Sequence, residues 1–344
     1  MSSNTKLKDR IDFIDLAKGF CIVLVVFTHV NSYFNLSYPL QETLSIFRMP
    51  LYFFLSGLFF KNYEGFCGFV KRKVNKLLIP FLFFYLTTSV ILPNLLHIIG
   101  YDVRNIDVIG WKSLWAFIYP PHQQFPNVPI WFLICLFICN LYFYALYTIS
   151  NKMQKFKMPI LIILNIFVGG MGYWLGINHI PLPMFLDTAM SALPFFCCGY
   201  ILRKYSTILY PNKTDKYLWL WITISFTYTA IFSGGVSYLN NSFDISFLTV
   251  YSCGITGTLS VIFIAKLLHK LPLFSYWGRY SIIILCTHNL IIQFLLIFLR
   301  KLPFSDWVMV LLTLIITLIL YLLIIPFCLK FMPYVTAQKD VLKT

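Results

Sequence analysis

The feature that most constrains this chain is a series of long apolar stretches along almost its whole length. A helix needs about 20 predominantly apolar residues to cross the hydrocarbon core of a bilayer. Composition agrees, because 59% of the 344 residues are hydrophobic and only 11% are charged, whereas about a quarter of a soluble domain is charged. We therefore predict an all-α, polytopic transmembrane helix bundle. Its ten predicted spans lie at residues 12–31, 44–60, 77–99, 129–149, 159–177, 185–202, 217–233, 245–265, 279–299 and 307–328.

The distribution of basic residues sets the orientation of this bundle. An even number of spans places both termini on the same side, and cytoplasmic loops carry an excess of Lys and Arg. With cytoplasmic termini, 21 Lys and Arg residues lie inside and four lie outside, namely Arg104, Lys112, Arg300 and Lys301. We expect cytoplasmic N- and C-termini in a cell membrane, the inner or plasma membrane. The net charge of +15 then reflects topology, and we expect no nucleic-acid partner.

The chain has no internal repeat, low-complexity segment or recognisable soluble domain, so we expect residues 1–344 to form a single membrane-bound domain. The nine cysteines lie almost all inside apolar stretches, and none is clustered with histidines at metal-ligand spacing. We interpret the cysteines as small buried hydrophobes and predict no metal site.

The first apolar stretch, DFIDLAKGFCIVLVVFTHV, carries the ionisable residues Asp15, Lys18 and His29 at membrane depth. A charge in hydrocarbon is costly, so such side chains usually face a protein interior or a wet cavity. Lys18 and His29 are 11 residues apart, so they share one helix face about 16 Å apart along the axis, and Asp15 lies one turn below Lys18. Two interpretations are open: a functional stripe, or an Asp15–Lys18 ion pair with a structural His29.

The second stretch contains FRMPLYFFLSGLFF, which favours the functional interpretation. This segment puts Arg48 near the depth of His29, and two basic groups at one depth suit an anionic or electron-rich ligand. Ser56 and Gly57 permit close backbone approach near its inner end.

A basic patch, FVKRKVNKLLIP, follows on the predicted cytoplasmic side and contains Lys71, Arg72, Lys73 and Lys76. Three roles are open for this patch. It can hold the phosphates of a cytoplasmic ligand, bind anionic lipid headgroups, or simply fix the topology.

Four segments, in collinear order from residue 10 to about residue 295, carry a resemblance to a known family. The first has Arg10, Asp15, Lys18-Gly19 and His29. The others are FRMPLYFFLSGLFF, NVPIWFLICLF, and WGRYSIIILCTHNLII with Ser281 and His288. Together they resemble the acyltransferase-3 family of integral membrane O-acyltransferases. Where that family has Arg-x-x-Arg at the inner face, this chain has Lys73-x-x-Lys76, which keeps the charge without the bidentate fork.

The resemblance implies an enzyme that takes an acyl group, usually acetyl, from cytoplasmic acetyl-CoA or another acyl-CoA. The acceptor would be a hydroxyl of a surface carbohydrate or a lipid-linked glycan, so the implied partners are a carbohydrate or glycolipid acceptor and membrane lipids. The short chain is most similar to compact members, the fucose 4-O-acetylase-like and other surface-polysaccharide O-acetyltransferases. The acceptor, the choice between acetyl and succinyl, and the oligomeric state stay open.

The same resemblance assigns roles to individual residues. His29 acts either as general base or as a transiently acylated nucleophile, Arg48 stabilises the oxyanion, and Asp15 completes the catalytic set. We predict four donor-binding residues, Lys18, Arg72, Lys73 and Lys76, and three substrate-binding residues, Ser56, Trp131 and His288. The other histidines, which we expect to be non-catalytic, are His97, His122, His179 and His269.

Two functions from other classes fit the same residues. A transporter or flippase for a glycan or lipid-linked sugar would line its route with the polar stripe and would need no base. A scaffold subunit of a polysaccharide-export assembly would use the buried polar residues to hold its helices together.

Overall fold

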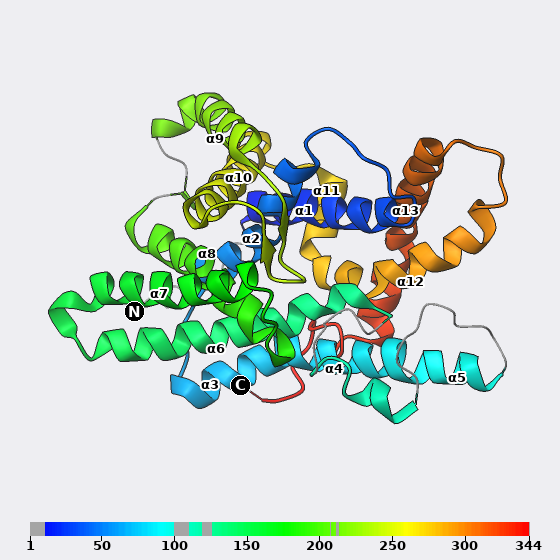
Figure 1. Ribbon diagram of the computed structural model, residues 1–344, viewed down its shortest axis with the longest axis horizontal. Coiled ribbons are helices and arrows are strands. Elements are labelled where there is room, and N and C mark those ends of the chain that lie inside the picture. Colours follow the sequence, from blue (N-terminus) through cyan, green and yellow to red (C-terminus); the bar gives the residue numbers. More distant parts are fainter. Residues whose placement is uncertain (1–10, 100–109, 119–125, 207, 211–212, 344) are drawn as a thin grey trace, which may run out of the picture.

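The computed structural model describes residues 11–99, 110–118, 126–206, 208–210 and 213–343, and these residues are almost entirely helical (Figure 1). The predicted residues Arg10, Arg104 and His122 lie outside this part of the chain. The α-helices are α1 (Asp12–Ser32), α2 (Gln41–Leu58), α3 (Gly65–Lys73), α4 (Ile79–Tyr85), α5 (Leu92–Ile98), α6 (Trp131–Asn151), α7 (Lys157–Ile177), α8 (Leu186–Tyr205), α9 (Leu218–Phe232), α10 (Phe247–Leu268), α11 (Pro272–Arg279), α12 (Ser281–Leu299) and α13 (Asp306–Phe331).

The number of helices that can cross a membrane supports the predicted polytopic bundle. Within the described residues, eight helical segments are long and apolar enough to span. The other two predicted spans also form helices, α2 and α9. With its 15 residues, α9 is only about 23 Å long, shorter than the roughly 30 Å hydrocarbon core. The prediction missed the short helices α3 and α11, and an antiparallel hairpin of β1 (Val236–Ser237) and β2 (Ser242–Phe243).

The third span differs from its prediction, because the helix begins at Gly65 and runs to Ile98. The basic patch is therefore helical, whereas the sequence placed it in a cytoplasmic loop. Two wide π-helical turns interrupt this helix, at Val74–Leu78 and Leu86–Ile91. Each ends two residues before a proline, Pro80 or Pro93. A proline has no N–H and its ring clashes with the carbonyl four residues earlier, and the wider turn relieves that clash.

Helix α1 lies at the centre of the bundle and contacts α2, α10, α11, α12 and α13. Its inner half packs backbone to backbone against α11, because a Cβ on Gly19 would lie 2.0 Å from the carbonyl oxygen of Phe274. A Cβ on Gly278 would lie 1.8 Å from the carbonyl oxygen of Asp15. Only glycine permits this close approach at both positions.

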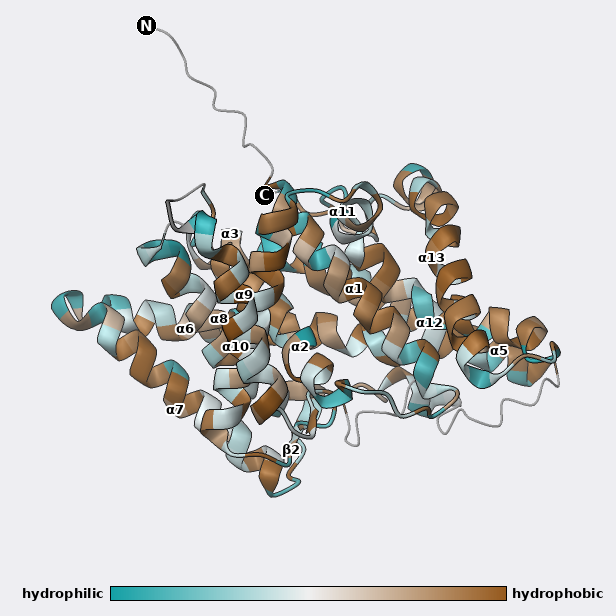
Figure 2. Ribbon diagram, turned by 90° about the horizontal axis from the view of Figure 1, so that it is seen from above, coloured by the Kyte–Doolittle hydropathy of each residue, from teal (hydrophilic) through white to brown (hydrophobic). Residues whose placement is uncertain are grey.

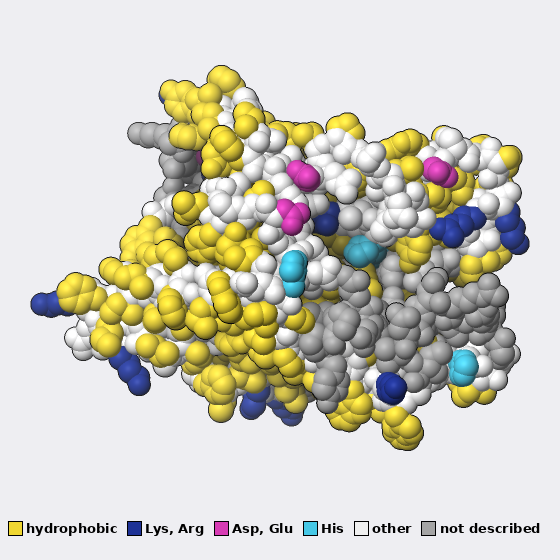
Figure 3. Space-filling model, viewed as in Figure 1, with side chains coloured by type: hydrophobic (Ala, Val, Ile, Leu, Met, Phe, Trp, Pro, Cys, Tyr) yellow, Lys and Arg dark blue, Asp and Glu magenta, His cyan; other side chains and the backbone are white. Residues whose placement is uncertain are grey.

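The bundle has two chemically distinct ends. Figure 2 shows the C-terminus, α3 and α11 at one edge and β2 at the opposite edge. Helix α1 starts at the first edge, because Asp12 forms an ion pair with Lys270, just before α11, at 3.3 Å. In the predicted orientation this edge is the cytoplasmic end. Between the ends, hydrophobic side chains cover much of the surface, as on α7 and α9 (Figure 3), which suits contact with lipid.

Candidate active site

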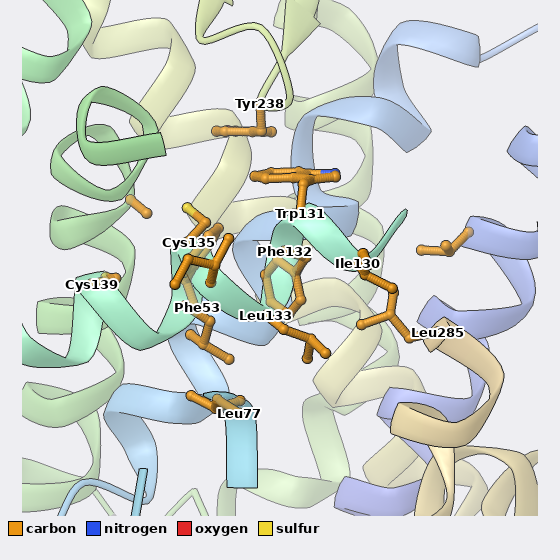
Figure 4. Close-up of a cluster of buried hydrophobic side chains, with 14 of the residues drawn as sticks. Phe53, Leu77, Ile130, Trp131, Phe132, Leu133, Cys135, Cys139, Tyr238 and Leu285 are labelled. Atoms are coloured by element: carbon orange, nitrogen blue, oxygen red, sulfur yellow. The ribbon is translucent and has the colours of Figure 1, made fainter. Parts of the chain in front are cut away.

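A cavity of about 510 Å³ occupies the inner half of the bundle. Its walls come from α1, α2, α6, α12 and the interrupted helix that begins at Gly65. The apolar part of the wall includes Leu77, Phe132, Leu133 and Leu285, which are labelled in Figure 4. All four predicted donor-binding residues line this cavity, together with the predicted substrate-binding Ser56 and with Ser281: Lys18, Arg72, Lys73, Lys76, Ser56 and Ser281.

Hydrogen bonds fix the walls of this inner cavity. The hydroxyl of Tyr52 donates to the carbonyl oxygen of Lys18 at 3.3 Å, which joins α2 to α1. Ser56 and the buried Asn140 bond to each other, with the amide nitrogen of Asn140 3.2 Å from the Ser56 hydroxyl. The ammonium of Lys73 lies 5.5 Å from the centre of the Phe69 ring, a cation–π distance. The cavity is therefore a preformed, largely apolar space with cationic groups on its wall.

The C-terminal segment contacts two of these cationic groups. The Asp340 carboxylate forms ion pairs with Arg72 and Lys76, each at 2.8 Å. Lys76 also donates to the carbonyl oxygen of Ala337 at 2.7 Å. The sequence prediction missed this arrangement. The sequence contains one indication of it. Asp340 is the only acidic residue after Asp306, which makes it a candidate partner for the basic patch.

Asn75, in the first π turn, holds the same segment through its side-chain amide. Its oxygen accepts from the backbone N–H groups of Val341 and Leu342, at 3.0 and 2.8 Å. Its nitrogen donates to the carbonyl oxygen of Leu342 at 2.8 Å. Because Asn75 is almost fully buried, these three bonds attach the end of the chain to the helix that carries the basic patch.

Further along α1, His29 meets a second histidine. The rings of His29 and His288 are 5.0 Å apart, centre to centre, and are tilted by 55°. His288, on α12, is fully buried, and its Nδ1 lies 2.8 Å from the carbonyl oxygen of Ile284. In the described residues its Nε2 has no hydrogen-bond partner. The sequence predicted that both histidines lie within the membrane. It did not predict their contact, because the two residues are 259 positions apart.

Arg48 lies beside this histidine pair, which agrees with the prediction that Arg48 and His29 lie at a similar depth in the membrane. Its guanidinium donates to the hydroxyl of Thr28, the residue before His29. The thiol of Cys21 donates to the carbonyl oxygen of Arg48 at 2.8 Å. These two contacts attach the Arg48 turn of α2 to α1 and hold a positive charge next to His29.

A second hollow, of about 340 Å³, lies beyond Thr28 at the outer end of α1. Uncharged polar side chains dominate its lining, and the sequence prediction did not identify it. Its signal in the sequence is the segment NSYFNLSYPLQETLS, which is rich in amides and hydroxyls. Asn31 shapes this segment by donating to the carbonyl oxygen of Leu36 at 2.7 Å. The lining residues are Thr28, Asn31, Ser32, Asn35, Leu36, Ser37, Tyr38, Gln41 and Ser45.

Five of the predicted site residues line neither hollow: Asp15, His29, Arg48, Trp131 and His288. Asp15 is buried where α1 packs against α11. Trp131 is buried in the hydrophobic core, with its ring 5.4 Å from that of Phe185, and Figure 4 shows it among other buried apolar side chains. The structure thus brings Arg48 and His288 close to His29, and buries Asp15 and Trp131 at other helix contacts.

Comparison with known proteins identifies the family. The family model described as an acyltransferase domain matches residues 11–327, nearly the whole chain. The chain belongs to the acyltransferase-3 family. This acyltransferase is therefore a multi-pass membrane enzyme that transfers acyl groups other than amino-acyl groups. No curated protein and no solved structure matches it.

Proposed function

We propose that this acyltransferase moves an acetyl group from cytoplasmic acetyl-CoA to a hydroxyl of a carbohydrate or glycolipid at the outer side of the cell membrane. The observation that carries the proposal is the pair of hollows along α1. Ile22 lines the inner cavity and Thr28 lines the outer pocket, so about 9 Å of helix separates them. His29 and Arg48 line neither hollow but lie next to this stretch, since His29 directly follows Thr28 and the Arg48 guanidinium donates to the Thr28 hydroxyl.

The inner cavity suits an acyl-CoA donor. A CoA thioester combines an anionic phosphate end with a long, weakly polar arm. Lys73 and Lys18 supply positive charge on the wall, and the rest of the lining is mainly apolar. Phosphates would be bound by lysine as point charges, because lysine lacks the fork of arginine.

The outer pocket suits a neutral, hydroxyl-rich acceptor. Its amide and hydroxyl side chains offer both donors and acceptors, as in Asn35, Gln41 and Ser45. Tyr38 adds an aromatic ring that can cover the apolar face of a sugar. An uncharged lining of this kind favours a carbohydrate over an anionic acceptor.

The residues at the junction supply the chemistry of acyl transfer. His29 accepts the proton of the acceptor hydroxyl while the oxygen attacks the thioester carbonyl. The Arg48 guanidinium stabilises the negative charge that develops on the carbonyl oxygen. When the carbon–sulfur bond breaks, His29 returns its proton to the departing thiolate. In this scheme His29 is a general base, and no acyl group is attached to the enzyme.

The test uses the purified protein in lipid nanodiscs with radiolabelled acetyl-CoA and a mixture of oligosaccharides. Wild type should transfer label, and His29→Ala should lower the rate by about 100-fold or more, the usual size of a general-base effect. The matched control is His97→Ala, since His97 is exposed and lines neither hollow. Equal transfer by wild type and His29→Ala at equal membrane yield would remove His29 from the mechanism.

A further inference from the structure

The hydrogen bond of His288 determines which of its two ring nitrogens carries the proton. A carbonyl oxygen can only accept, so the 2.8 Å contact between Nδ1 and the Ile284 carbonyl requires the proton on Nδ1. A neutral imidazole carries one N–H, which leaves Nε2 with a lone pair and no proton. Buried acceptors normally have partners. His288 Nε2 is fully buried and has none within the described residues.

The neighbouring residue holds this part of α12 in place. Asn289 donates to the carbonyl oxygen of Pro126 at 2.9 Å and accepts from the hydroxyl of Tyr33 at 3.1 Å. Tyr33 directly follows α1, so α12 is attached to the outer end of the helix that carries His29. The 5.0 Å separation of the two histidine rings is therefore set by contacts on both helices.

We propose that His288 is a positioning residue for His29, a role that rests on the proposed function. The part of the chain that the structure describes shows no bond at Nε2, and the His29 ring, 5.0 Å away centre to centre, is the group that we place there: in the reacting enzyme Nε2 of His288 accepts the single N–H of neutral His29. This bond fixes the tautomer of His29, so its other ring nitrogen carries a lone pair for the acceptor hydroxyl. When His29 takes the hydroxyl proton it becomes an imidazolium with two N–H groups. One stays bonded to His288, and the other later goes to the thiolate of CoA.

This arrangement parallels the way a carboxylate orients the histidine of a catalytic triad, but the partner here is neutral. A neutral acceptor suits a buried position inside a membrane, where an additional charge would be costly. With His288 as the acceptor, no acidic residue is needed to orient His29. Asp15, the acid in the first-helix motif, is buried against α11 and lies about 21 Å along α1 from His29.

Two substitutions separate this role from a structural one. In His288→Asn, the amide nitrogen can take the place of Nδ1 and bond to Ile284, but nothing replaces Nε2. In His288→Gln, the longer amide reaches the position of Nε2 and offers an acceptor oxygen, but the bond to Ile284 is lost. A structural role predicts that Asn is the better substitute, and a positioning role predicts that Gln is.

The measurements are kcat and the acetyl-CoA KM in nanodiscs, at matched membrane yield. We expect His288→Asn to lower kcat by more than tenfold and His288→Gln by less than fivefold, with the acetyl-CoA KM unchanged in both. A His288→Asn enzyme as fast as wild type, or one faster than His288→Gln, would overturn the inference. If wild type transfers no acyl group from acetyl-CoA, the proposed function fails instead.

A second measurement needs neither activity nor a variant. Nitrogen NMR of the wild-type protein with ¹⁵N-labelled histidine reports which ring nitrogen carries the proton. We expect His288 to be protonated on Nδ1, and its unprotonated Nε2 to show coupling across a hydrogen bond to His29. A proton on Nε2 of His288, or the absence of any coupling, contradicts the positioning role whatever the activity of the enzyme.

Discussion

The two hollows along α1 differ in charge, in lining and in what covers them. The inner cavity has lysine and arginine side chains on a largely apolar wall, and the C-terminal segment is bonded to its basic residues. Among the described residues, the outer pocket is lined mainly by amides and hydroxyls, and by no charged side chain. Because a CoA ester is anionic and a sugar is neutral, this contrast gives the proposed reaction a direction, from donor inside to acceptor outside.

The largest effect is expected at the junction. Arg48→Gln removes the positive charge beside His29 while leaving an amide that can still bond to Thr28. We expect kcat to fall by about 100-fold or more, the usual cost of removing an oxyanion donor, with the acetyl-CoA KM nearly unchanged. Arg48→Lys keeps the charge and should retain more activity than Arg48→Gln. If Arg48→Gln keeps more than half of the wild-type kcat, Arg48 does not stabilise the transition state.

A smaller effect is expected in the inner cavity. Lys73→Gln removes a half-buried cation from the cavity wall. The acetyl-CoA KM should rise about tenfold, with kcat changed less, because a phosphate contact acts about equally in the ground and transition states. Lys73→Arg should keep the affinity. The control is Lys112→Gln, because Lys112 is exposed and lines neither hollow. An unchanged KM in a well-inserted Lys73→Gln enzyme would show that the donor phosphates bind elsewhere.

A substitution in the outer pocket should change the KM of the acceptor and leave the KM of the donor unchanged. Gln41→Ala removes one polar group from its lining, and we expect the acceptor KM to rise about fivefold, the value of one hydrogen bond, while the acetyl-CoA KM is unchanged. Glu42→Gln is the neighbouring control, since Glu42 does not line the pocket. A change in the donor KM with Gln41→Ala would mean that the two hollows do not bind separate substrates.

Much of the inner cavity could be predicted because its features are local in the sequence. Apolar length identifies a spanning helix, and helical periodicity puts Lys18 and His29 on one face. Pairings between distant segments leave no such signal. The contact between His29 and His288, and that between Asp340 and Arg72, depend on packing of the whole bundle. Helix α3 was missed because its sequence, GFCGFVKRK, is too polar and glycine-rich to extend an apolar stretch.

Trp131 illustrates a different limit of the sequence. A motif resemblance placed it at the substrate, but the structure buries it in the core near Phe132 and Phe185. Motif position alone does not distinguish a side chain that supports a wall from one that lines it. The role of Asn75 also could not be predicted. An asparagine within a basic patch gives no indication that it binds the C-terminal segment.

The smallest effect is expected where the C-terminal segment meets the inner cavity. Asp340 pairs with Arg72 and Lys76, so its carboxylate competes with an anionic donor for the same two cations. Asp340→Asn should therefore lower the acetyl-CoA KM by about threefold, in line with the modest strength of partly exposed ion pairs. The difference from wild type should shrink at high salt, because salt screens both interactions. Asp306→Asn, at the start of α13, is the matched acidic control and should leave the KM unchanged. A higher KM in Asp340→Asn would show the reverse relationship, in which the carboxylate holds Arg72 and Lys76 in place for the donor, and the C-terminal segment would then be part of the donor site.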